Sequence, residues 1–393
     1  MEPLLRFKED DGSKFPKWEE HNLSMFLDEN RLRNVDLKFG KKDVLSVSGD
    51  YGVVNQIEFQ GRSFAGKSVQ QYHILPHNGI VYTKSPLKAN PYGIIKANKG
   101  VAGIVSTLYA VFDCKNNVIP EFVDAYFDLD ERLNKYLKPL VNIGAKHDMK
   151  ISNERFLSGR VCFPSLPEQK KIASFLSMID EIIQSTESEL TAWQERKKGV
   201  MQKIFNREVR FKADDGSEFP EWEEKRLDEV VEFLDGLRKP LEAGERVAGP
   251  YPYYGASGII DYVENYIFDD ELVLLSEDGA NIIDRNYRVA FLAKGKYWVN
   301  NHAHVLKAVD SNVNYFICEQ LESFDYRKYN SGGAQPKLNQ ATCRSIIMRM
   351  PCVEEQRKIA DCLSSLDDVI NQIKVELSAW KEFKKGLLQQ MFV

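Results

Sequence analysis

One short motif contains residue types that could bind phosphate. The run Gly61-Arg62-Ser63-Phe64-Ala65-Gly66-Lys67-Ser68 matches the pattern of a phosphate-binding loop. Such a loop works when it lies between a strand and the start of a helix, whose amide groups surround the phosphate. The residues that follow, from Val69 to Pro76, instead predict a short strand that ends at a proline. The match therefore favours chance over nucleotide binding.

Two other motifs are incomplete. His302 and His304 could both ligate a metal ion, but no third ligand is evident nearby, and two histidines in a strand are more often hydrogen-bonded polar groups. Asn90-Pro91-Tyr92 resembles part of the Asn-Pro-Pro-aromatic loop of adenine methyltransferases, but one proline and the glycine-rich cofactor loop are missing. No convincing set of nucleophile, histidine and carboxylate is evident. We therefore expect no catalytic residues, no metal site and no bound cofactor in this chain.

Two stretches rich in Lys and Arg predict an attraction to phosphate. Residues 51–112 contain six basic residues and one acid, Glu58, and residues 285–309 contain five basic residues and no acid. Aromatic residues are interleaved in both. The whole chain has a formal net charge of −5, but the local potential decides whether a phosphate is attracted. The alternative is that the basic residues of each stretch simply lie on the solvent-exposed face of a sheet.

Composition sets the broad class. The 393 residues suffice for about two to four domains, and 43% hydrophobic with 28% charged residues is ordinary for a globular protein. No apolar run approaches the roughly 18 residues that a membrane span needs, and the first residues do not resemble a signal peptide. The six cysteines form no Cys-x-x-Cys pair. We expect a reduced, cytoplasmic protein with no membrane partner.

Much of the sequence occurs twice. The leader from Phe7 to Trp18 returns 204 residues later from Phe211 to Trp222, and Glu168–Ala173 returns 187 residues later as Glu355–Ala360. The shared segments enclose two unlike inserts. A duplicated frame around different inserts predicts a pseudo-two-fold scaffold that does one job on two different targets.

The elements that position these residues begin with two long helices. After each repeated motif, apolar residues alternate in steps of four and three, which predicts a coiled-coil seam. The seam residues are Ile172, Leu176, Ile179, Ile183, Leu190, Trp193, Ile359, Leu363, Leu366, Ile370, Leu377 and Trp380. About 38 residues make a helix of roughly 55–60 Å. We expect the two helices to pair with each other in antiparallel orientation; pairing with another protein or with a second copy of this chain is the alternative.

Lys197 and Lys384 interrupt both seams at the same place. They could fix the orientation of the pair, or their stems could simply reach out to water. Outside the helices, short apolar runs between glycine turns predict strands such as 79–82, 103–112, 251–260, 271–275, 289–293 and 303–307, with helices within 118–140 and 313–320. The predicted fold class is α+β, with two mixed α/β domains joined by two long antiparallel coiled-coil helices.

Pro164–Ala173 and Pro351–Ala360 both contain Pro-x-x-x-Glu-Gln-(Lys/Arg)-Lys-Ile-Ala. With the leaders at 7–22 and 211–226 and the segment Asn300–Val305, they resemble the specificity (S) subunit of type I restriction–modification enzymes over essentially the whole chain. The resemblance implies target recognition domains at 1–163 and 207–350 and spacer helices at 164–206 and 351–393. Each domain would read one half of a bipartite, asymmetric DNA site. The helix pair would set the spacing and dock the methyltransferase subunits.

The resemblance also implies partners and their cofactors. These are double-stranded DNA, two modification subunits that use S-adenosylmethionine, and restriction subunits that use ATP and Mg²⁺. The residues that could contact DNA are Asn55, Gln56, Gln60, Arg62, Lys84, Lys146, Arg238, Ser257, Arg285, Asn300, His302, Gln335 and Lys337. The alternatives are a coiled-coil scaffold without a DNA role, a nucleotide-binding protein, and a nuclease or methyltransferase in its own right.

Overall fold

The computed structural model describes residues 3–87, 89–143, 149–308 and 313–392. The chain folds into two compact units. Unit 1 contains Met1–Glu187 and Val375–Val393, and unit 2 contains Ser188–Lys374. Each unit therefore contains one insert and one part of each long helix. In the described part of the chain, no helix is long and apolar enough to cross a membrane.

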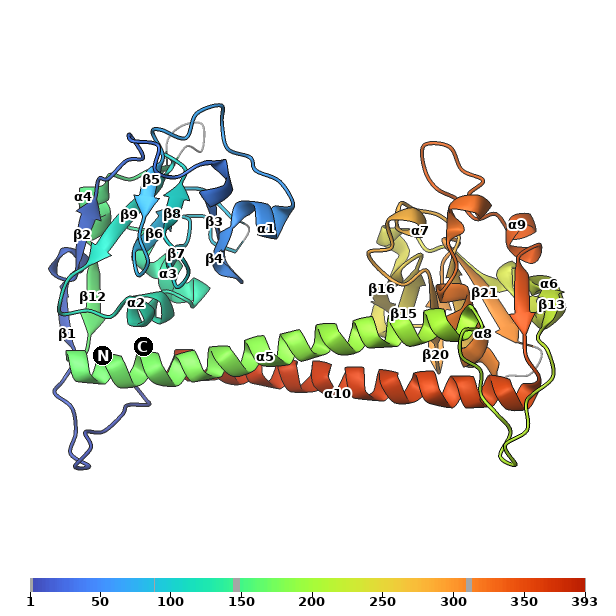
Figure 1. Cartoon of the computed structure of the whole chain (residues 1–393). Coiled ribbons are helices and arrows are strands. Elements are labelled where there is room, and N and C mark those ends of the chain that lie inside the picture. The colour runs from blue at the N-terminus through green and yellow to red at the C-terminus, as the bar shows by residue number, and fades with distance from the viewer. Residues whose placement is uncertain (1–2, 88, 144–148, 309–312, 393) are drawn as a thin grey trace. The chain divides into compact units, whose positions relative to one another are not determined.

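Each repeated motif begins a long helix (Figure 1). α5 runs from Leu166 to Phe205 and α10 from Val353 to Met391. Pro167 lies in the first turn of α5, where a helix does not need the amide hydrogen that proline lacks. The prediction of two long helices from the alternating apolar pattern is confirmed.

In unit 1 the first half of α5 packs against the second half of α10. The Nζ atom of Lys384 lies 2.7 Å from Oδ1 of Asp180, and that of Lys381 lies 2.6 Å from Oε1 of Glu187. Later positions in α5 thus face earlier positions in α10, so this part of the pair is antiparallel.

In unit 2 the second half of α5 packs against the first half of α10. The Nζ atom of Lys197 lies 2.8 Å from both carboxylate oxygens of Asp367. Met201 and Ile204 of α5 share a buried cluster with Ile359 of α10. This part of the pair is also antiparallel, because position 197 faces 367 while positions 201–204 lie with 359.

The insert of unit 1 is built on a four-stranded antiparallel sheet in the order β2-β9-β6-β7. Its strands are β2 (Leu27–Asn30), β9 (Tyr109–Cys114), β6 (Ile80–Thr83) and β7 (Ile95–Ala97). Two-stranded ladders pair β3 (Leu45–Ser48) with β4 (Gly52–Asn55), β5 (His73–Leu75) with β8 (Gly103–Val105), and β10 (Asn142–Ile143) with β11 (Met149–Lys150). The helices of this insert are α1 (Gln56–Gln60), α2 (Pro120–Tyr126), α3 (Asp130–Leu137) and α4 (Asn153–Leu157).

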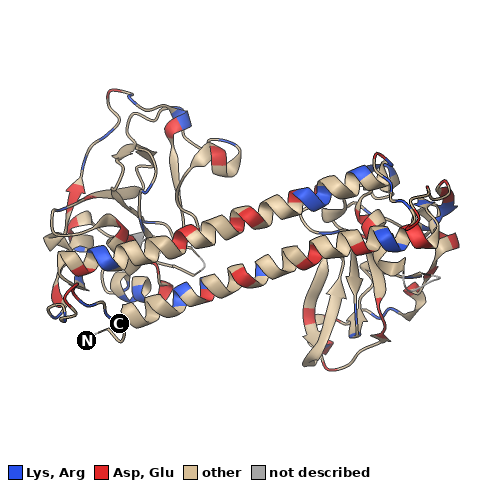
Figure 2. Ribbon diagram, turned by 60° about the horizontal axis from the view of Figure 1, so that its bottom comes forward, with Lys and Arg blue, Asp and Glu red and all other residues tan. Residues whose placement is uncertain are grey.

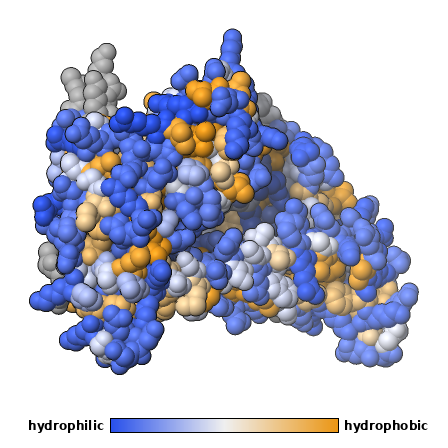
Figure 3. Space-filling model, turned by 60° about the vertical axis from the view of Figure 1, so that its left-hand side comes forward, coloured by the Kyte–Doolittle hydropathy of each residue, from blue (hydrophilic) through white to orange (hydrophobic). Residues whose placement is uncertain are grey.

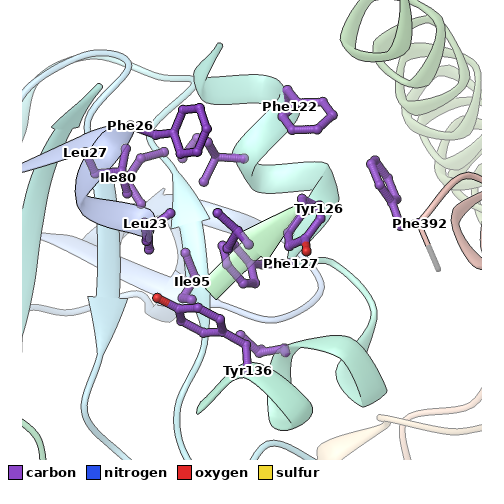
Figure 4. Close-up of a cluster of buried hydrophobic side chains, with 14 of the residues drawn as sticks. Leu23, Phe26, Leu27, Ile80, Ile95, Phe122, Tyr126, Phe127, Tyr136 and Phe392 are labelled. Atoms are coloured by element: carbon purple, nitrogen blue, oxygen red, sulfur yellow. The ribbon is translucent and has the colours of Figure 1, made fainter. Parts of the chain in front are cut away.

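The core of unit 1 includes the end of the second long helix (Figure 4). Buried residues of the sheet, among them Ile80 and Ile95, share one cluster with α2 and with Phe392, which directly follows α10. The Phe392 ring lies 5.7 Å from that of Phe122 and 5.6 Å from that of Tyr126. Burying such a ring contributes about 1.5–3 kcal/mol, so this contact fixes α10 to the insert.

The insert of unit 2 contains two four-stranded sheets. The first has the order β14-β21-β18-β19 and consists of β14 (Val231–Phe233), β21 (Ala303–Ala308), β18 (Leu272–Ser276) and β19 (Ala290–Ala293). The second has the order β16-β15-β20-β17 and consists of β16 (Gly258–Val263), β15 (Ala248–Gly255), β20 (Lys296–Val299) and β17 (Phe268–Asp269). The helices are α6 (Leu227–Val230), α7 (Asn281–Asp284), α8 (Asn314–Glu322) and α9 (Gln340–Arg344). Buried residues of α8 and of the first sheet belong to one cluster.

The two leaders occupy equivalent places. In unit 1, β1 (Glu19–Asn22) pairs with β12 (Arg160–Phe163), and in unit 2, β13 (Glu223–Arg226) pairs with β22 (Ile347–Met350). Both ladders are antiparallel, and in both the second strand comes just before a long helix. The sequence repeat is therefore also a structural repeat.

Two predicted strands are interrupted by turns. The run 103–112 divides into β8 and β9 because the amide of Tyr109 bonds to the carbonyl of Ser106 at 3.0 Å. The run 251–260 is a hairpin rather than one strand, and Gly258 in its turn has a φ of 127°, which residues with a side chain rarely adopt. Both turns had signals in the sequence, Ser106-Thr107 in the first run and Gly255 with Gly258 in the second.

The predicted seam residues differ in burial along the helices. Ile172, Leu176 and Ile179 are buried, and they contact the insert of unit 1 as part of its core. Leu190 and Trp193 are only half-buried. The sequence predicted that the apolar seam residues contact only the other long helix, but the insert of each unit also covers part of the seam.

Candidate nucleic-acid interface

Asn55 and Gln56, at the start of α1, form hydrogen bonds with backbone groups of nearby residues. The side-chain oxygen of Asn55 accepts the amide hydrogens of Ile57 at 2.9 Å and Glu58 at 3.3 Å, which caps the helix. The side-chain oxygen of Gln56 accepts the amide hydrogen of Phe64 at 2.7 Å. These two candidates therefore shape α1 and the loop after it.

Other side chains of this loop face solvent. Gln60, Arg62 and Lys67 are exposed, and the Arg62 guanidinium lies 4.6 Å from the centroid of the Phe64 ring, which is itself 57% exposed. We call Gln60, Arg62, Phe64 and Lys67 the reading edge of unit 1. Cations beside an exposed aromatic ring suit a nucleic acid, because phosphate attracts the charge and a base can stack on the ring.

A groove of about 420 Å³ lies along α1. Apolar side chains such as Val53, Phe59 and Val101 line it together with the polar Asn55 and Asn98 and the acidic Glu58. Figure 3 shows hydrophobic patches that interrupt an otherwise hydrophilic surface on one face of the molecule. Apolar surface next to amide groups suits contact with the edge of a base, where methyl groups and hydrogen-bonding atoms alternate.

Two candidates of unit 1 do not belong to the reading edge. Lys84 donates to Asn153 at 2.8 Å, and Asn153 donates in turn to Glu29 at 2.7 Å. Burial lowers the pKa of Lys84, and the Glu29 carboxylate opposes that effect. Lys84 is thus part of an internal network, while Lys146 lies outside the described residues.

Three candidates of unit 2 gather around two acids at the end of β18. The Arg238 guanidinium lies 2.7 Å from Glu277, and the Lys337 amine lies 3.4 Å from the same carboxylate. Nδ1 of His302 lies 2.9 Å from Asp278. The sequence predicted all three basic residues as DNA contacts. It did not predict the role of the acids, although two adjacent acids directly after an apolar strand were a signal.

Asn300 supports this cluster from inside. It is buried, with 4% of its surface exposed, and its side-chain oxygen accepts the amide hydrogen of His302 at 2.8 Å. Asn300 therefore positions His302 and does not itself face solvent.

His304, two residues further on, is completely buried between two hydrogen-bond acceptors. Its Nδ1 lies 2.7 Å from Asp235 Oδ2, and its Nε2 lies 2.7 Å from the carbonyl oxygen of Leu338. Since both partners accept, both ring nitrogens must donate, which makes the ring an imidazolium. Burial alone would lower the pKa of His304, but the hydrogen bond to Asp235 and the nearby Cys343 raise it to about 10.

The bond from His304 to Leu338 holds a glycine-containing loop, residues 331–339. A side chain on Gly332 would collide with the carbonyl of Gln335, so the loop needs glycine to fold back on itself. The side chains of Gln335 and Lys337 in this loop are exposed. The hairpin turn with the exposed Ser257 lies near the same strand end, because Ser276 Oγ donates to the carbonyl of Ala256 at 2.5 Å.

We call Ser257, His302, Gln335 and Lys337 the reading edge of unit 2. These side chains supply hydroxyl, imidazole, amide and amine groups, which can bond to base edges and phosphates. Arg285 is not counted among them, since its side chain is less exposed, 32% against 48% for Lys337, and its guanidinium also bonds to the backbone carbonyl of Glu322.

Most of the described basic residues in the two basic stretches form ion pairs with acids, whereas Arg62 and Lys67 remain exposed. Within unit 1, Lys96 lies 2.5 Å from Asp128 and Lys99 lies 2.8 Å from Asp124. In unit 2 the corresponding ion pairs are Arg288–Glu319, Lys307–Asp270 and Lys294–Glu271. The acids come from segments outside the stretches, so counting charges along the sequence overstated the local positive potential. Figure 2 shows charges of both signs interspersed along the two long helices.

The alternative chemistries receive little structural support. The loop Gly61–Ser68 follows α1 and leads to the strand β5, so the match to a phosphate-binding loop lacks its helix, as the sequence predicted. His302 and His304 bond to different acids, Asp278 and Asp235. Among the described residues, no group of three or more His, Cys, Asp or Glu side chains could hold a metal ion.

Comparisons with known proteins agree on one family. A family model described as type I restriction modification DNA specificity domain matches residues 38–192 and 220–379. A putative type I restriction enzyme specificity subunit of Haemophilus influenzae is 37% identical over 161 residues, which cover 41% of this chain and 40% of that protein. The type I restriction enzyme MjaVIII specificity subunit of Methanocaldococcus jannaschii is 25% identical over 201 residues, 48% of this chain and 46% of that protein. The chain thus spans about half the length of these curated relatives.

A solved structure shares the fold. The S subunit of a type I restriction–modification system from M. genitalium aligns with a TM-score of 0.61 at 17% sequence identity, and the alignment covers 100% of this chain and 99% of that one. Both units and both long helices therefore have counterparts in that protein.

Proposed function

Because the chain belongs to the type I restriction modification DNA specificity family, we propose that it is the DNA sequence-specificity subunit of such a complex. Each unit reads one half of a bipartite, asymmetric site on double-stranded DNA. The observation that carries this proposal is the repetition of one frame around two different reading edges. Arg62 and Lys67 in unit 1 and Lys337 in unit 2 contact phosphates, while Gln60, Ser257, His302 and Gln335 contact base edges.

The long helices supply the spacing in this proposal. α5 and α10 are continuous over 40 and 39 residues, and a helix rises about 1.5 Å per residue. Two readers joined by helices would accept only half-sites at a fixed separation, as dimeric DNA-binding proteins do.

The same helices would dock two modification subunits. Gly199 in α5 and Gly386 in α10 occupy the same place in the repeat, and a Cβ atom at either position would meet nothing within 4 Å. Glycine inside a helix costs about 1 kcal/mol relative to alanine, and no contact among the described residues requires it there. Several flanking exposed residues are also the same, with Ala192, Glu195 and Gln202 matched by Ala379, Glu382 and Gln389, although Gln194 and Arg196 correspond to Lys381 and Phe383. Two similar surfaces with room for close approach support binding of one kind of partner at both places.

We further propose that this chain is not itself an enzyme. Methylation of adenine with S-adenosylmethionine would belong to the modification subunits, and ATP- and Mg²⁺-dependent translocation and cleavage to restriction subunits. The complex would act on DNA in the cytoplasm.

The test is the methylation pattern of cells that express this chain with its modification subunits. We expect one bipartite motif with a constant spacer, and replacement of residues 23–163 by the insert of another family member should change one half of the motif only. A change in both halves would contradict the modular assignment. Methylation or cleavage by the purified chain alone would instead indicate an enzyme.

A DNA-independent scaffold is distinguished by fluorescence anisotropy. We expect binding of the assembled complex to a duplex with the motif, with an affinity that falls as salt increases. No salt-dependent binding, with or without the partners, would support the scaffold.

A further inference from the structure

A half-buried lysine in the second half of α10, Lys384, joins three elements of unit 1. The Nζ atom of Lys384 lies 2.7 Å from Asp180 in α5 and 3.0 Å from Asp128, which follows α2 in the insert. Asp128 also accepts from Lys96 of β7 at 2.5 Å. Burial alone would raise the pKa of Asp128, but Lys96 and Lys384 lower it to about 2, so it stays ionised. We call Lys384, Asp180, Asp128 and Lys96 hub 1.

Unit 2 contains the same arrangement around Lys197 of α5. Its Nζ atom lies 2.8 Å from Asp367 in α10 and 2.9 Å from Glu319 in α8 of the insert. Glu319 pairs with Arg288 at 2.5 Å. The side chains of Lys197 and Glu319 are only 8% and 2% exposed. We call Lys197, Asp367, Glu319 and Arg288 hub 2.

Within each hub, the two helix residues come from the sequence repeat, whereas the second carboxylate comes from the insert. Lys197 and Lys384, and likewise Asp180 and Asp367, are 187 residues apart and belong to the repeated frame. Asp128 and Glu319 instead come from unlike inserts, one after α2 and one within α8. Duplication of the frame explains the lysine and the aspartate. The two inserts differ in sequence, although one family model matches both, and each still brings a carboxylate to the lysine.

Stability alone does not explain the hubs either. Replacing a buried ion pair by apolar side chains is often neutral or stabilising, because both charges must lose their water. An ion pair with hydrogen bonds is directional, however, whereas apolar side chains can shift relative to each other with little loss of interaction energy. In hub 1 the amine donates to Asp128 of the insert at 3.0 Å, and in hub 2 it donates to Asp367 of the partner helix at 2.8 Å, while the remaining carboxylate of each hub is held by an ion pair. A lysine amine held between two carboxylates on different elements therefore defines the orientation of an insert on its helices.

We propose that Lys384 and Lys197 are positioning residues that fix the seat of each insert on the helix pair and thereby the spacer length of the DNA site. The inference depends on the proposed function, because spacer length has meaning only for a bipartite site. Each lysine acts on its own unit, so either hub can be changed separately.

The experiment uses the complex with the modification subunits and the double variants Lys384→Met/Asp180→Asn and Lys197→Met/Asp367→Asn. Methionine keeps most of the length of lysine, and removing the aspartate charge limits the number of unpaired carboxylates. Methylation is measured on a set of duplexes that share both half-sites and differ in spacer length by one base pair. For either variant we expect the preference between the natural spacer and its neighbours to fall at least tenfold, with unchanged half-site sequences.

Two controls separate positioning from damage. Lys381→Met changes the same helix one turn away, where the pair with Glu187 is more exposed, and should keep the natural spacer preference. Lys384→Arg should also keep it, because a guanidinium can bond to both carboxylates. If a double variant folds and assembles but methylates all spacers in the wild-type ratio, the proposal is wrong, although the bipartite motif itself would stand.

If a double variant shows no methylation, hydrogen exchange of the purified full chain distinguishes a loss of positioning from unfolding of the unit. Faster exchange confined to segments at the hub, such as β7 for hub 1, supports positioning. Unfolding of the whole unit would contradict it, because the lysine would then be needed for stability.

Discussion

Glu355 is completely buried at the start of α10 and forms an ion pair with Arg210 at 2.9 Å. Trp222 Nε1 donates to the same carboxylate at 3.0 Å. In unit 1, Glu168 at the start of α5 pairs with Arg6 at 2.7 Å. Each leader thus binds the first turn of the long helix in its own unit, which explains why leader and helix motif occur together in both copies.

We expect Glu355→Gln to lower the free energy of unfolding by about 1–3 kcal/mol, because charged hydrogen bonds to Arg210 and Trp222 weaken in a buried place. Urea unfolding measures the change. Glu354→Gln is the matched control: Glu354 is exposed, and such substitutions usually change stability by less than about 0.5 kcal/mol. Equal changes for both variants would show that the contact between the leader and Glu355 contributes no more to the free energy of unfolding than an exposed carboxylate does.

The buried imidazolium of His304 predicts a pH dependence. Its pKa is raised from the ordinary histidine value of 6.5 to about 10 in the folded chain, so the folded state holds this proton more tightly than the unfolded state. The stabilisation is complete below about pH 6.5 and is lost as the pH rises towards 10. The groups that face the ring are Asp235, Glu277 and Cys343.

We expect the free energy of unfolding to fall by up to a few kcal/mol between pH 6.5 and 10, because each unit of pKa shift corresponds to about 1.4 kcal/mol. His304→Gln should be less stable at pH 6.5 and should have a flatter pH profile than the wild type. Parallel profiles for the two proteins would show that His304 does not titrate as described.

Two predictions follow for DNA binding by the reading edge of unit 1. Arg62→Gln and Lys67→Gln should each weaken binding of the complex and lower the slope of log affinity against log salt by about 0.9, because each would release one counterion less. Anisotropy titrations at several salt concentrations measure this. Lys135→Gln removes an equal charge from the exposed surface of α3 and should leave the slope unchanged; an equal decrease for Lys135 would mean that only total charge matters.

The sequence predicted the frame because its signals are local. The steps of four and three from Ile172 and from Ile359 lie within single helices, and periodicity within one element is independent of the rest of the fold. The role of Asn55 was also visible, since Asn55 and Glu58 have the spacing of a helix cap and its partner. The proposal that Asn55 also contacts DNA stays a prediction.

The charges could not be assigned from the sequence, because their partners are distant in the chain. Lys96 pairs with Asp128, and Arg288 pairs with Glu319; both acids belong to helices or turns far from the basic stretches. Lys197 looked like a seam interruption, and whether its stem would reach water depended on Glu319, 122 residues away. Which polar residues remain exposed is decided by tertiary contacts, so the reading edges became visible only in the structure.

The helix glycines give the last prediction. Gly199→Leu and Gly386→Leu should raise the stability of the isolated chain by about 0.5–1 kcal/mol each, since leucine favours helix over glycine and the position is open. Both variants should weaken binding of the modification subunits at least tenfold, because the side chain fills the space that a partner helix would occupy. Gln194→Ala, at another exposed position of α5, is the control and should bind normally. Stable variants that bind the partners with wild-type affinity would show that the docking surface lies elsewhere.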